Sequence, residues 1–218
     1  LLHQTINGNE AILQMEQAGD YPDIIVGCTG GGSNLAGLMF PFLGQQLRGG
    51  QKIDIIGCEP LSCPSFTKGK YAYDHGDMAR MTPLIKMHTL GSDFLPPANH
   101  SGGLRYHGMS YHLSHLYDLG LMRAKAYGQK DCFEAGVIFG KQEGIIPAPE
   151  GNHAVKGAMD AALECKEKGE SKTILFNLCG HGHFDMTAYD DYFNGRLADD
   201  FYDEETANKS LSALPEIA

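Results

Sequence analysis

The sequence lacks the features that mark membrane proteins and nucleic-acid binders. No run of about 18 apolar residues occurs, which is the length that a spanning helix needs. The first 20 residues contain Asn7, Glu10 and Glu16 where a signal peptide requires an apolar stretch. Lys- and Arg-rich runs are absent and the formal net charge is -10, so a basic surface for polyanions is missing. We expect a cytoplasmic protein that binds neither nucleic acid nor membranes.

Closely spaced cysteine pairs and internal repeats are also absent. The 6 cysteines are dispersed through the chain and none forms a Cys-x-x-Cys pair. A chain of 218 residues with 42% apolar side chains can bury a sizeable core without disulfides. We therefore predict reduced thiols, in one large domain or two small ones.

The sequence also lacks a methionine at its first position. It starts with Leu1, in a segment that already has the pattern of a helix. Apolar residues recur at helical spacing from residue 4 to residue 18, and Gly19 follows as a stop signal. We expect the 218 residues to be a fragment of a larger protein.

Short apolar runs alternate with helical patterns along the chain. The runs 23–28 and 53–58 are rich in β-branched residues and predict strands that are buried on both faces. Between them, Ser33 is positioned to cap a helix that reaches Leu47, with Pro41 and Gly44 expected to kink or shorten it. This order predicts an α/β fold with a parallel sheet, whose ligand site lies at the carboxyl ends of the strands.

The second half of the chain continues this pattern after an irregular stretch. Residues 59–108 are rich in proline and glycine and show little periodicity, so we interpret them as the wall and mouth of a site. Helices are expected over 111–119 and 130–141, with a short ordered run over 122–127 between them. A further helix capped by Asn152 should end before Gly169, and a third buried strand should follow over 173–178.

A glycine-rich turn follows the first predicted strand and opens a predicted helix. Backbone N–H groups without side chains in the way, at the positive end of a helix dipole, suit a phosphate group. The turn lacks the Gly-Lys-Ser/Thr ending of a P-loop and the Gly-x-Gly-x-x-Gly spacing of dinucleotide sites. A single-phosphate ligand is favoured, and the alternative is a turn that needs glycine only for its backbone conformation. The residues concerned are Gly30, Gly31, Gly32, Ser33 and Asn34.

Several segments together resemble one family. CTGGGSNLAG, HSGGLRYHG, EGIIPAPEGNHA and NLCGHGHFD follow in the order and spacing of the motifs of the tryptophan synthase beta chain, most closely its second, stand-alone class. The resemblance implies a fold type II pyridoxal-phosphate architecture, with a parallel sheet and flanking helices. It further implies that residues 1–195 form the cofactor-binding α/β domain, in the large C-terminal part of a bigger enzyme. The acidic composition of the end of the chain predicts that residues 196–218 form a tail that is solvated or partly disordered.

The resemblance assigns roles around a bound pyridoxal 5'-phosphate. The glycine-rich turn would hold the phosphate, and Glu150 would lie beside the cofactor ring, although it could equally be a surface acid that suits a helix N-terminus. Cys179 occupies the position where the family has a small hydroxyl residue, usually serine, that hydrogen-bonds the pyridine nitrogen. A thiol is a weaker donor and acceptor. The alternative for Cys179 is a small buried hydrophobe.

The substrate side would be formed by Gly103 and Arg105. Many family members have an aspartate at the position of Arg105, whereas a guanidinium could clamp a carboxylate. The resemblance also implies a monovalent cation held by backbone carbonyls near this segment. His181 and His183 suggest a transition metal, but no third ligand has suitable spacing, so we predict no metal there.

One element of the family's machinery has no counterpart in these residues. Its members hold the cofactor as a Schiff base with a lysine in a His-Lys-x-Asn motif, and no lysine here lies in such a motif. The catalytic glutamate that assists indole also belongs to the absent N-terminal part. We therefore expect no catalytic residue in this chain and no turnover by it alone.

The intact enzyme implied by the resemblance replaces the hydroxyl group of L-serine with indole, giving L-tryptophan and water. A homodimer is expected, and docking of an alpha subunit stays open. Other fold type II enzymes, such as threonine synthase, cysteine synthase or serine dehydratase, are the nearest alternatives. A non-catalytic domain that binds a phosphate-bearing ligand is the alternative from another class.

Overall fold

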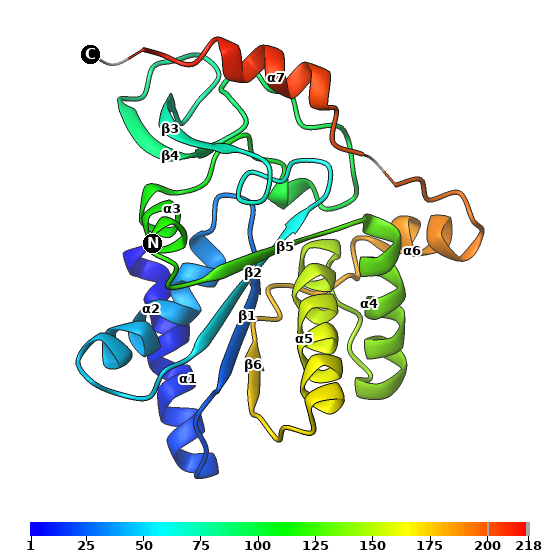
Figure 1. Cartoon of the computed structure of the whole chain (residues 1–218). Coiled ribbons are helices and arrows are strands. Elements are labelled where there is room, and N and C mark those ends of the chain that lie inside the picture. Colours follow the sequence, from blue (N-terminus) through cyan, green and yellow to red (C-terminus); the bar gives the residue numbers. More distant parts are fainter. Residues whose placement is uncertain (200, 217–218) are drawn as a thin grey trace.

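The computed structural model describes residues 1–199 and 201–216, which build a parallel sheet between two layers of helices (Figure 1). The 4-stranded sheet has the order β5-β2-β1-β6. Its strands are β1 (Ile24–Cys28), β2 (Asp54–Pro60), β5 (Arg123–Tyr127) and β6 (Ile174–Phe176), and all three pairings are parallel. The predicted α/β class and the predicted strands in the first half of the chain are confirmed.

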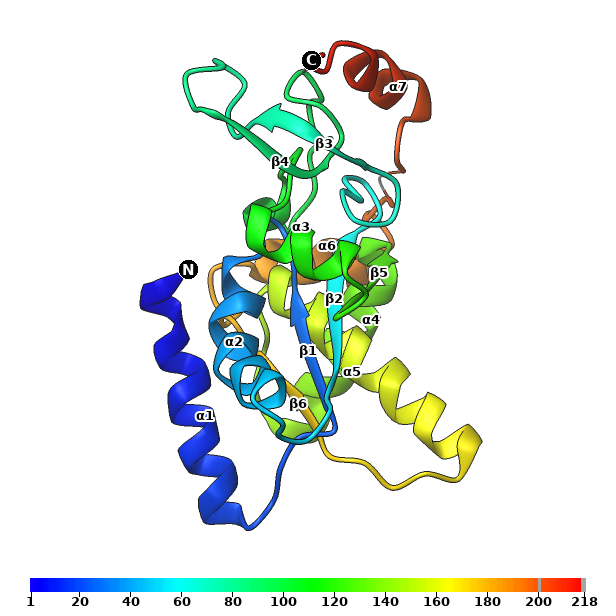
Figure 2. The same ribbon diagram turned by 60° about the vertical axis from the view of Figure 1, so that its left-hand side comes forward.

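The central strands are buried on both faces because helices cover both. Helices α1 (Thr5–Ala18), α2 (Ser33–Leu47) and α3 (Tyr111–Asp118) lie on one face, whereas α4 (Gln129–Glu143) and α5 (Pro149–Lys168) lie on the other (Figures 1 and 2). Alternate residues of β1 therefore enter different cores. Ile25 packs with Leu35 beneath α2, and Val26 packs with Ala161 of α5.

The third predicted strand is shorter and less buried than expected. We predicted a buried strand over 173–178, but β6 spans Ile174–Phe176 and is half-buried throughout. Within the described residues it pairs only with β1, where Ile24 lies opposite Ile174. An edge strand keeps one side free of partners, and its apolar sequence does not distinguish it from a central strand.

Helix α2 begins and continues differently from its prediction. Ser33 is its first residue and not its cap, because Gly32 with φ +85° makes the turn into the helix. Pro41 lies inside the helix without ending it. The Pro41 ring packs against α1, where a β-carbon on Gly8 would lie 2.7 Å from it. This helix-on-helix packing offsets the backbone hydrogen bond that proline removes.

Helix α5 begins one turn earlier than predicted. Ala148 precedes it and Pro149 is its first residue, which is a favourable place for proline. Asn152 is therefore not a cap. It is fully buried inside the helix, where its amide donates to the Tyr189 hydroxyl at 3.1 Å. Tyr189 belongs to α6 (Met186–Phe193), which packs against Phe133 of α4.

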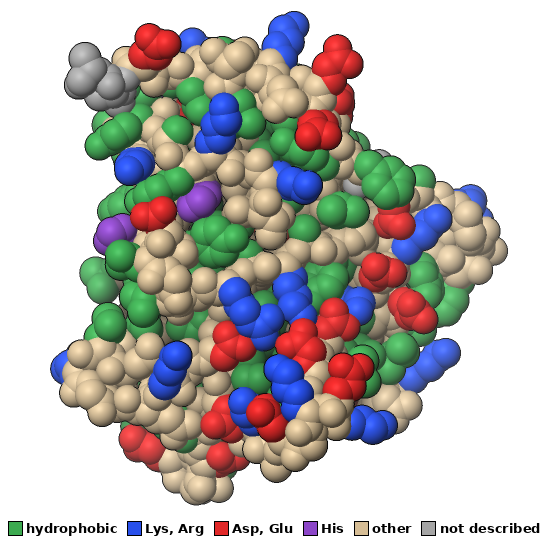
Figure 3. Space-filling model, viewed as in Figure 1, with side chains coloured by type: hydrophobic (Ala, Val, Ile, Leu, Met, Phe, Trp, Pro, Cys, Tyr) green, Lys and Arg blue, Asp and Glu red, His purple; other side chains and the backbone are tan. Residues whose placement is uncertain are grey.

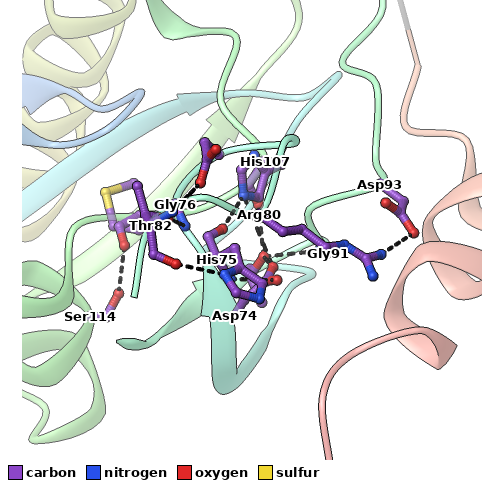
Figure 4. Close-up of polar contacts among 12 residues, drawn as sticks. Asp74, His75, Gly76, Arg80, Thr82, Gly91, Asp93, His107 and Ser114 are labelled. Carbon is purple, nitrogen blue, oxygen red and sulfur yellow. Dashed lines mark hydrogen bonds and ion pairs between the residues drawn. The ribbon is translucent and has the colours of Figure 1, made fainter. Parts of the chain in front are cut away.

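Residues 59–108 are not an irregular loop, because they contain an antiparallel hairpin of β3 (Lys70–His75) and β4 (Leu84–Thr89) and a short helix η2 (Gly102–Leu104). Polar contacts connect the turn end of β3 with β4 and with the segment that contains His107 (Figure 4). The buried Asp74 carboxylate accepts from Thr89 Oγ1 at 2.6 Å, and His107 Nε2 lies 2.9 Å from the carbonyl of His75. The strands of the hairpin lack a clear alternation of apolar and polar residues, and polar contacts of this kind help to stabilise it. The sequence pattern therefore did not reveal the hairpin.

The acidic tail contains a helix that the sequence analysis did not predict. Asp203 caps α7 (Glu204–Ser212) by accepting from two backbone N–H groups. Ala207 and Leu211 are buried, and Ala207 packs with Leu90 and Phe94 above the hairpin (Figure 2). The expectation of a solvated or disordered end therefore does not describe residues 204–212. Residues 200, 217 and 218 of the predicted tail lie outside the described residues.

Surface charge is mixed on the face shown in Figure 3, where acidic and basic side chains interleave over β5 and α5. Arg123 forms ion pairs with Asp54 at 2.8 Å and Glu164 at 3.6 Å, and Lys125 pairs with Glu164. This face therefore carries no extended patch of one sign. None of the helices in the described ranges combines the length and the apolarity that crossing a membrane requires.

Candidate functional site

The glycine-rich turn joins the carboxyl end of β1 to the first turn of α2. Gly32 has φ +85°, a backbone conformation that residues with a β-carbon rarely adopt. Within the described residues, the backbone N–H groups of Gly30, Gly31, Gly32, Ser33 and Asn34 donate no hydrogen bond. The Ser33 side chain is exposed. Free N–H groups at a helix N-terminus form an anion-binding site, so the predicted phosphate cradle has the required donors.

Gly30 brings the turn against the segment predicted to line the substrate side. A β-carbon on Gly30 would lie 2.7 Å from the Leu104 Cα and 2.9 Å from the Gly103 carbonyl oxygen. The neighbouring Gly31 has more room, since its nearest contact would be the Tyr106 ring at 3.8 Å. Glycine at position 30 thus permits two backbone segments, far apart in the sequence, to touch.

Glu150 connects the start of α5 to the same segment. Its Oε1 accepts a hydrogen bond from the Gly103 N–H at 2.8 Å. The carboxylate lies in the first turn of α5, where the helix dipole also favours a negative charge. Glu150 and Gly103, which the sequence analysis placed in one site, are therefore in contact.

The Arg105 side chain does not take part in these contacts. Its guanidinium is exposed and donates to the carbonyl oxygen of Pro96 at 2.6 Å. Within the described residues it forms no hydrogen bond with Glu150 or with the glycine-rich turn. The structure thus places Gly103 at the site and Arg105 at its periphery, with nitrogen donors that remain open to solvent.

Cys179 lies where β6 ends, beside β1. Its Sγ is 3.4 Å from Sγ of Cys28, the last residue of β1. Cys28 is the buried partner, and the hydrogen bond with Cys179 together with burial raises its pKa well above the usual range. Either sulfur can be the donor in this contact. The raised pKa of Cys28 means that Cys28 keeps its proton, whereas the same hydrogen bond lowers the pKa of the half-buried Cys179 thiol.

The sequence analysis missed two residues of the site, Cys28 and Asn177. The Asn177 amide donates to Oδ1 of Asn34 at 2.8 Å and lies 3.3 Å from the Asn34 carbonyl oxygen, so it fixes the cradle to the end of β6. Both residues lie at strand ends that precede glycine-rich bends. The signal was present in the sequence, but using it required knowing that β1 and β6 are neighbours.

These groups meet at one edge of the sheet and fit a ligand with a phosphate and a planar ring. The unpaired N–H donors suit the phosphate, while Glu150 and Cys179 supply an acceptor and a thiol nearby. The buried Thr29 Oγ1, which has no partner among the described residues, adds a polar atom beside the turn. Two lysines of the sheet and its covering helix are engaged in ion pairs, since Lys125 of β5 pairs with Glu164 and Lys156 of α5 pairs with Asp160.

Two other places in the structure are less suitable for the ligand. The rings of His181 and His183 lie 4.9 Å apart, but the part of the chain that the structure describes contains no group of three ligands for a metal ion. A larger hollow of about 660 Å³ lies between α2, α3 and the hairpin, and its lining is mainly apolar. Its residues include Phe40, Leu43, Tyr71 and Tyr111. We locate the site at the cradle, where the polar groups converge, and not at this hollow.

The chain is similar to known proteins over most of its length. The sequence model of the family described as "Pyridoxal-phosphate dependent enzyme" matches residues 5–180. The chain is 57% identical over 202 residues to tryptophan synthase beta chain 2 of Aquifex aeolicus, covering 91% of this chain and 46% of that protein. It is 49% identical over 215 residues to the tryptophan synthase beta chain of Pyrococcus horikoshii, covering 99% and 46%. The chain thus spans about half the length of the curated relatives it matches.

The fold has a counterpart among solved structures. A fungal L-serine ammonia-lyase from Rhizomucor miehei superimposes with a TM-score of 0.62 at 14% identity, over 89% of this chain and 56% of that one. At such low identity the likeness concerns the fold, and it agrees with the predicted fold type II architecture. The family match covers most of the chain, including the turn and the segments that meet it. The chain belongs to the family of pyridoxal-phosphate dependent enzymes.

Proposed function

We propose that this chain forms the phosphate- and ring-binding part of a pyridoxal-phosphate dependent tryptophan synthase beta chain. The intact enzyme would replace the hydroxyl group of L-serine with indole, giving L-tryptophan and water. The observation that carries the proposal is the set of free backbone N–H groups from Gly30 to Asn34, beside Glu150 and Cys179. High identity to tryptophan synthase beta chains supports the choice of reaction.

When bound, pyridoxal phosphate supplies an electron sink for bond changes at the carbons of the amino acid. The glycine-rich turn would hold its phosphate, and the dipole of α2 would stabilise the negative charge. Glu150 keeps the Gly103 backbone in place through the 2.8 Å hydrogen bond. The chain's contribution is to bind and orient the cofactor.

Cys179 is the proposed partner of the pyridine nitrogen. Either sulfur can donate in the contact between Cys28 and Cys179, and when Cys28 is the donor the S–H of Cys179 is free to donate to a ring nitrogen. A neutral partner of this kind leaves the ring a weaker electron sink than an aspartate would. That property suits replacement at the β-carbon. The lowered pKa of Cys179 makes its S–H a better donor than an ordinary thiol.

Arg105 is the proposed recognition group for a substrate carboxylate. Its exposed guanidinium uses Nη2 for the Pro96 carbonyl, and the other N–H groups can form the paired hydrogen bonds that a carboxylate accepts. Replacing Arg105 by lysine should raise KM for L-serine more than it lowers kcat, because a positive charge remains but the paired geometry is lost.

The lysine that would carry the cofactor is proposed to lie outside these 218 residues, because none of the lysines has the family's motif. We expect the isolated chain to give no specific covalent adduct when it is mixed with pyridoxal phosphate and reduced with borohydride. Peptide mapping by mass spectrometry checks this. A stoichiometric adduct on a single lysine would contradict the proposed division of the site.

The reaction is tested with the intact protein that contains this chain. It is incubated with pyridoxal phosphate and L-serine, with and without indole, and L-tryptophan and pyruvate are quantified. L-tryptophan that forms only with indole supports the proposal. Pyruvate without L-tryptophan would indicate a serine dehydratase. The absence of both products would favour another fold type II enzyme or a non-catalytic binding domain.

The remaining properties implied by the resemblance are proposals as well. We propose a homodimer in the cytoplasm and a monovalent cation bound by backbone carbonyls near the Gly103 segment. Sedimentation of the intact protein tests the dimer. Comparing its activity in potassium, sodium and tetramethylammonium buffers tests the cation, because the last ion is too large for a carbonyl cage.

A further inference from the structure

Two thiols are in contact at the ring side of the site. Cys28 Sγ and Cys179 Sγ are 3.4 Å apart, although the residues are separated by 151 positions in the sequence. The contact follows from the sheet. Val26 lies opposite Phe176 in the parallel pairing of β1 with β6, and Cys28 and Cys179 follow these two residues by two and three positions.

The two sulfur atoms are close enough for a disulfide to form after a small movement. The sulfur atoms would have to approach by about 1.4 Å to reach the bond length of about 2.05 Å. Cys179 is followed by Gly180 and His181, both exposed, so the moving residue belongs to a loop at the surface.

The two thiols differ in a way that gives each a distinct role. Cys179 is half-exposed and can meet a reagent from solvent, whereas Cys28 is 2% exposed and cannot. Attack by a thiolate on a disulfide requires access and a deprotonated sulfur. The lowered pKa of Cys179 favours it as the thiol that reacts first.

The other cysteines do not offer this arrangement. Cys58 lies opposite Cys28 in the pairing of β1 with β2, but it is fully buried and forms no sulfur contact with Cys28 within the described residues. Burial raises the pKa of Cys58 to about 12. Cys58 is therefore an inert neighbour of the pair and a suitable control.

We propose that Cys28 and Cys179 form a reversible disulfide under oxidising conditions, and that this disulfide closes the ring side of the site. The cysteine pair would make cofactor binding sensitive to the redox state of the surroundings. The disulfide itself depends only on the contact between the thiols. The effect on the cofactor rests on the proposed function of Cys179.

The reaction needs a small disulfide, such as oxidised glutathione, as the oxidant. The Cys179 thiolate attacks one glutathione sulfur, the glutathione disulfide bond breaks, and one glutathione leaves with the proton that Cys179 lost. The deprotonated Cys28 sulfur then attacks Sγ of Cys179, and the second glutathione leaves with the Cys28 proton. Two protein thiols are oxidised to one disulfide, and one glutathione disulfide is reduced to two thiols.

The test begins with the reduced chain, which is incubated with oxidised glutathione, denatured and alkylated. Mass spectrometry should show that two of the 6 cysteines escape alkylation and that one cross-linked peptide contains Cys28 and Cys179. Dithiothreitol should reverse the link. Because the pKa of Cys28 is raised, the intramolecular step should accelerate as the pH rises above neutrality.

Matched variants identify the pair. In Cys28→Ala, Cys179 should stop at a stable glutathione adduct and no cross-link should form, whereas Cys58→Ala should form the cross-link as the unaltered chain does. Circular dichroism confirms that each variant is folded. A Cys28–Cys58 link, or six alkylated cysteines after prolonged oxidation, would overturn the proposal.

A second readout separates the disulfide from the function of the site. Binding of 4'-deoxypyridoxine 5'-phosphate, which has no aldehyde to react with lysines, is measured by calorimetry on the reduced and oxidised chains. Loss of the hydrogen bond from Cys179 should weaken binding about fivefold, and dithiothreitol should restore it. A cross-link that forms with unchanged binding would contradict the proposed role of Cys179 while leaving the oxidation of the pair intact.

Discussion

Single residues decide whether the cradle can exist, and Gly30 is the clearest case. From the sequence, we explained this glycine by the need for accessible backbone N–H groups. The structure adds a second reason, which is the approach of the Leu104 backbone. That reason was hidden from the sequence, because it depends on a segment more than 70 positions away.

Gly30→Ala should disturb both stability and ligand binding. The added β-carbon would lie 2.7 Å from Leu104 Cα, and backbone atoms cannot yield as a flexible side chain does, so we expect a loss of about 1 to 3 kcal/mol. Gly31→Ala is the control, since its β-carbon would lie 3.8 Å from the nearest atom, and it should change stability by less than about 1 kcal/mol. Urea denaturation measures both. Equal losses of unfolding free energy in the two variants would contradict the conclusion that the Leu104 backbone requires glycine at position 30.

At the scale of elements, the sequence predicted the strands and helices whose pattern of apolar residues reflects their burial. Strands β1 and β2 have apolar, β-branched centres and were found, whereas the hairpin β3–β4 was missed. The hairpin is held by polar contacts at Asp74 and His107. Such contacts join residues across the chain and leave no periodic trace. Helix α7 was missed for a different reason, because its many acidic residues suggested only a solvated end although Ala207 and Leu211 are buried.

Asp74→Ala should destabilise the hairpin far more than Asp93→Ala. Asp74 is fully buried and accepts from Thr89 at 2.6 Å, so its removal leaves the buried Thr89 hydroxyl with only the more distant His107 carbonyl oxygen, at 3.3 Å, as acceptor and should cost about 3 kcal/mol. Asp93 pairs with Arg80 at the surface, and its removal should cost less than about 1 kcal/mol. Thermal unfolding of the two variants provides the comparison. Similar effects would show that the hairpin does not depend on Asp74.

Glu59 at the end of β2 makes the stability of the fold depend on pH. Its carboxylate accepts from Phe66 N and from Thr67 N and Oγ1 at 2.7 to 2.9 Å. Burial nevertheless raises its pKa to about 7 from 4.5. The folded state then binds the proton more tightly than the unfolded state, so this group stabilises the fold fully below about pH 4.5 and loses that contribution as the pH rises through 7.

The measurement is the difference in unfolding free energy between the unaltered chain and Glu59→Gln. That difference should fall by about 2 to 3 kcal/mol between about pH 5 and pH 8. Burial of His153 lowers its pKa to about 4 and has the opposite effect on stability, but it is common to both proteins and cancels. Parallel stability curves over this range would show that the Glu59 carboxyl does not titrate as described.

At the scale of the whole molecule, the resemblance to a known family indicated candidate site residues that the periodicity of the sequence did not. Composition and pattern gave an α/β sheet with a phosphate cradle, and the family motifs indicated that Glu150 and Gly103 belong to the same site. The order β5-β2-β1-β6 explains why Asn177 and Cys28 also belong to it. No rule of spacing predicts strand order from one sequence, so these two residues emerged only with the structure.

The central claim is that the glycine-rich turn binds the phosphate of the cofactor. The most direct test is a titration of the isotopically labelled chain with 4'-deoxypyridoxine 5'-phosphate, followed by amide NMR. The largest shifts should occur at the free N–H groups from Gly30 to Asn34, with smaller shifts at Cys179 and Gly103. Unchanged signals from the turn, with shifts at the apolar hollow lined by Phe40 and Tyr111, would contradict it.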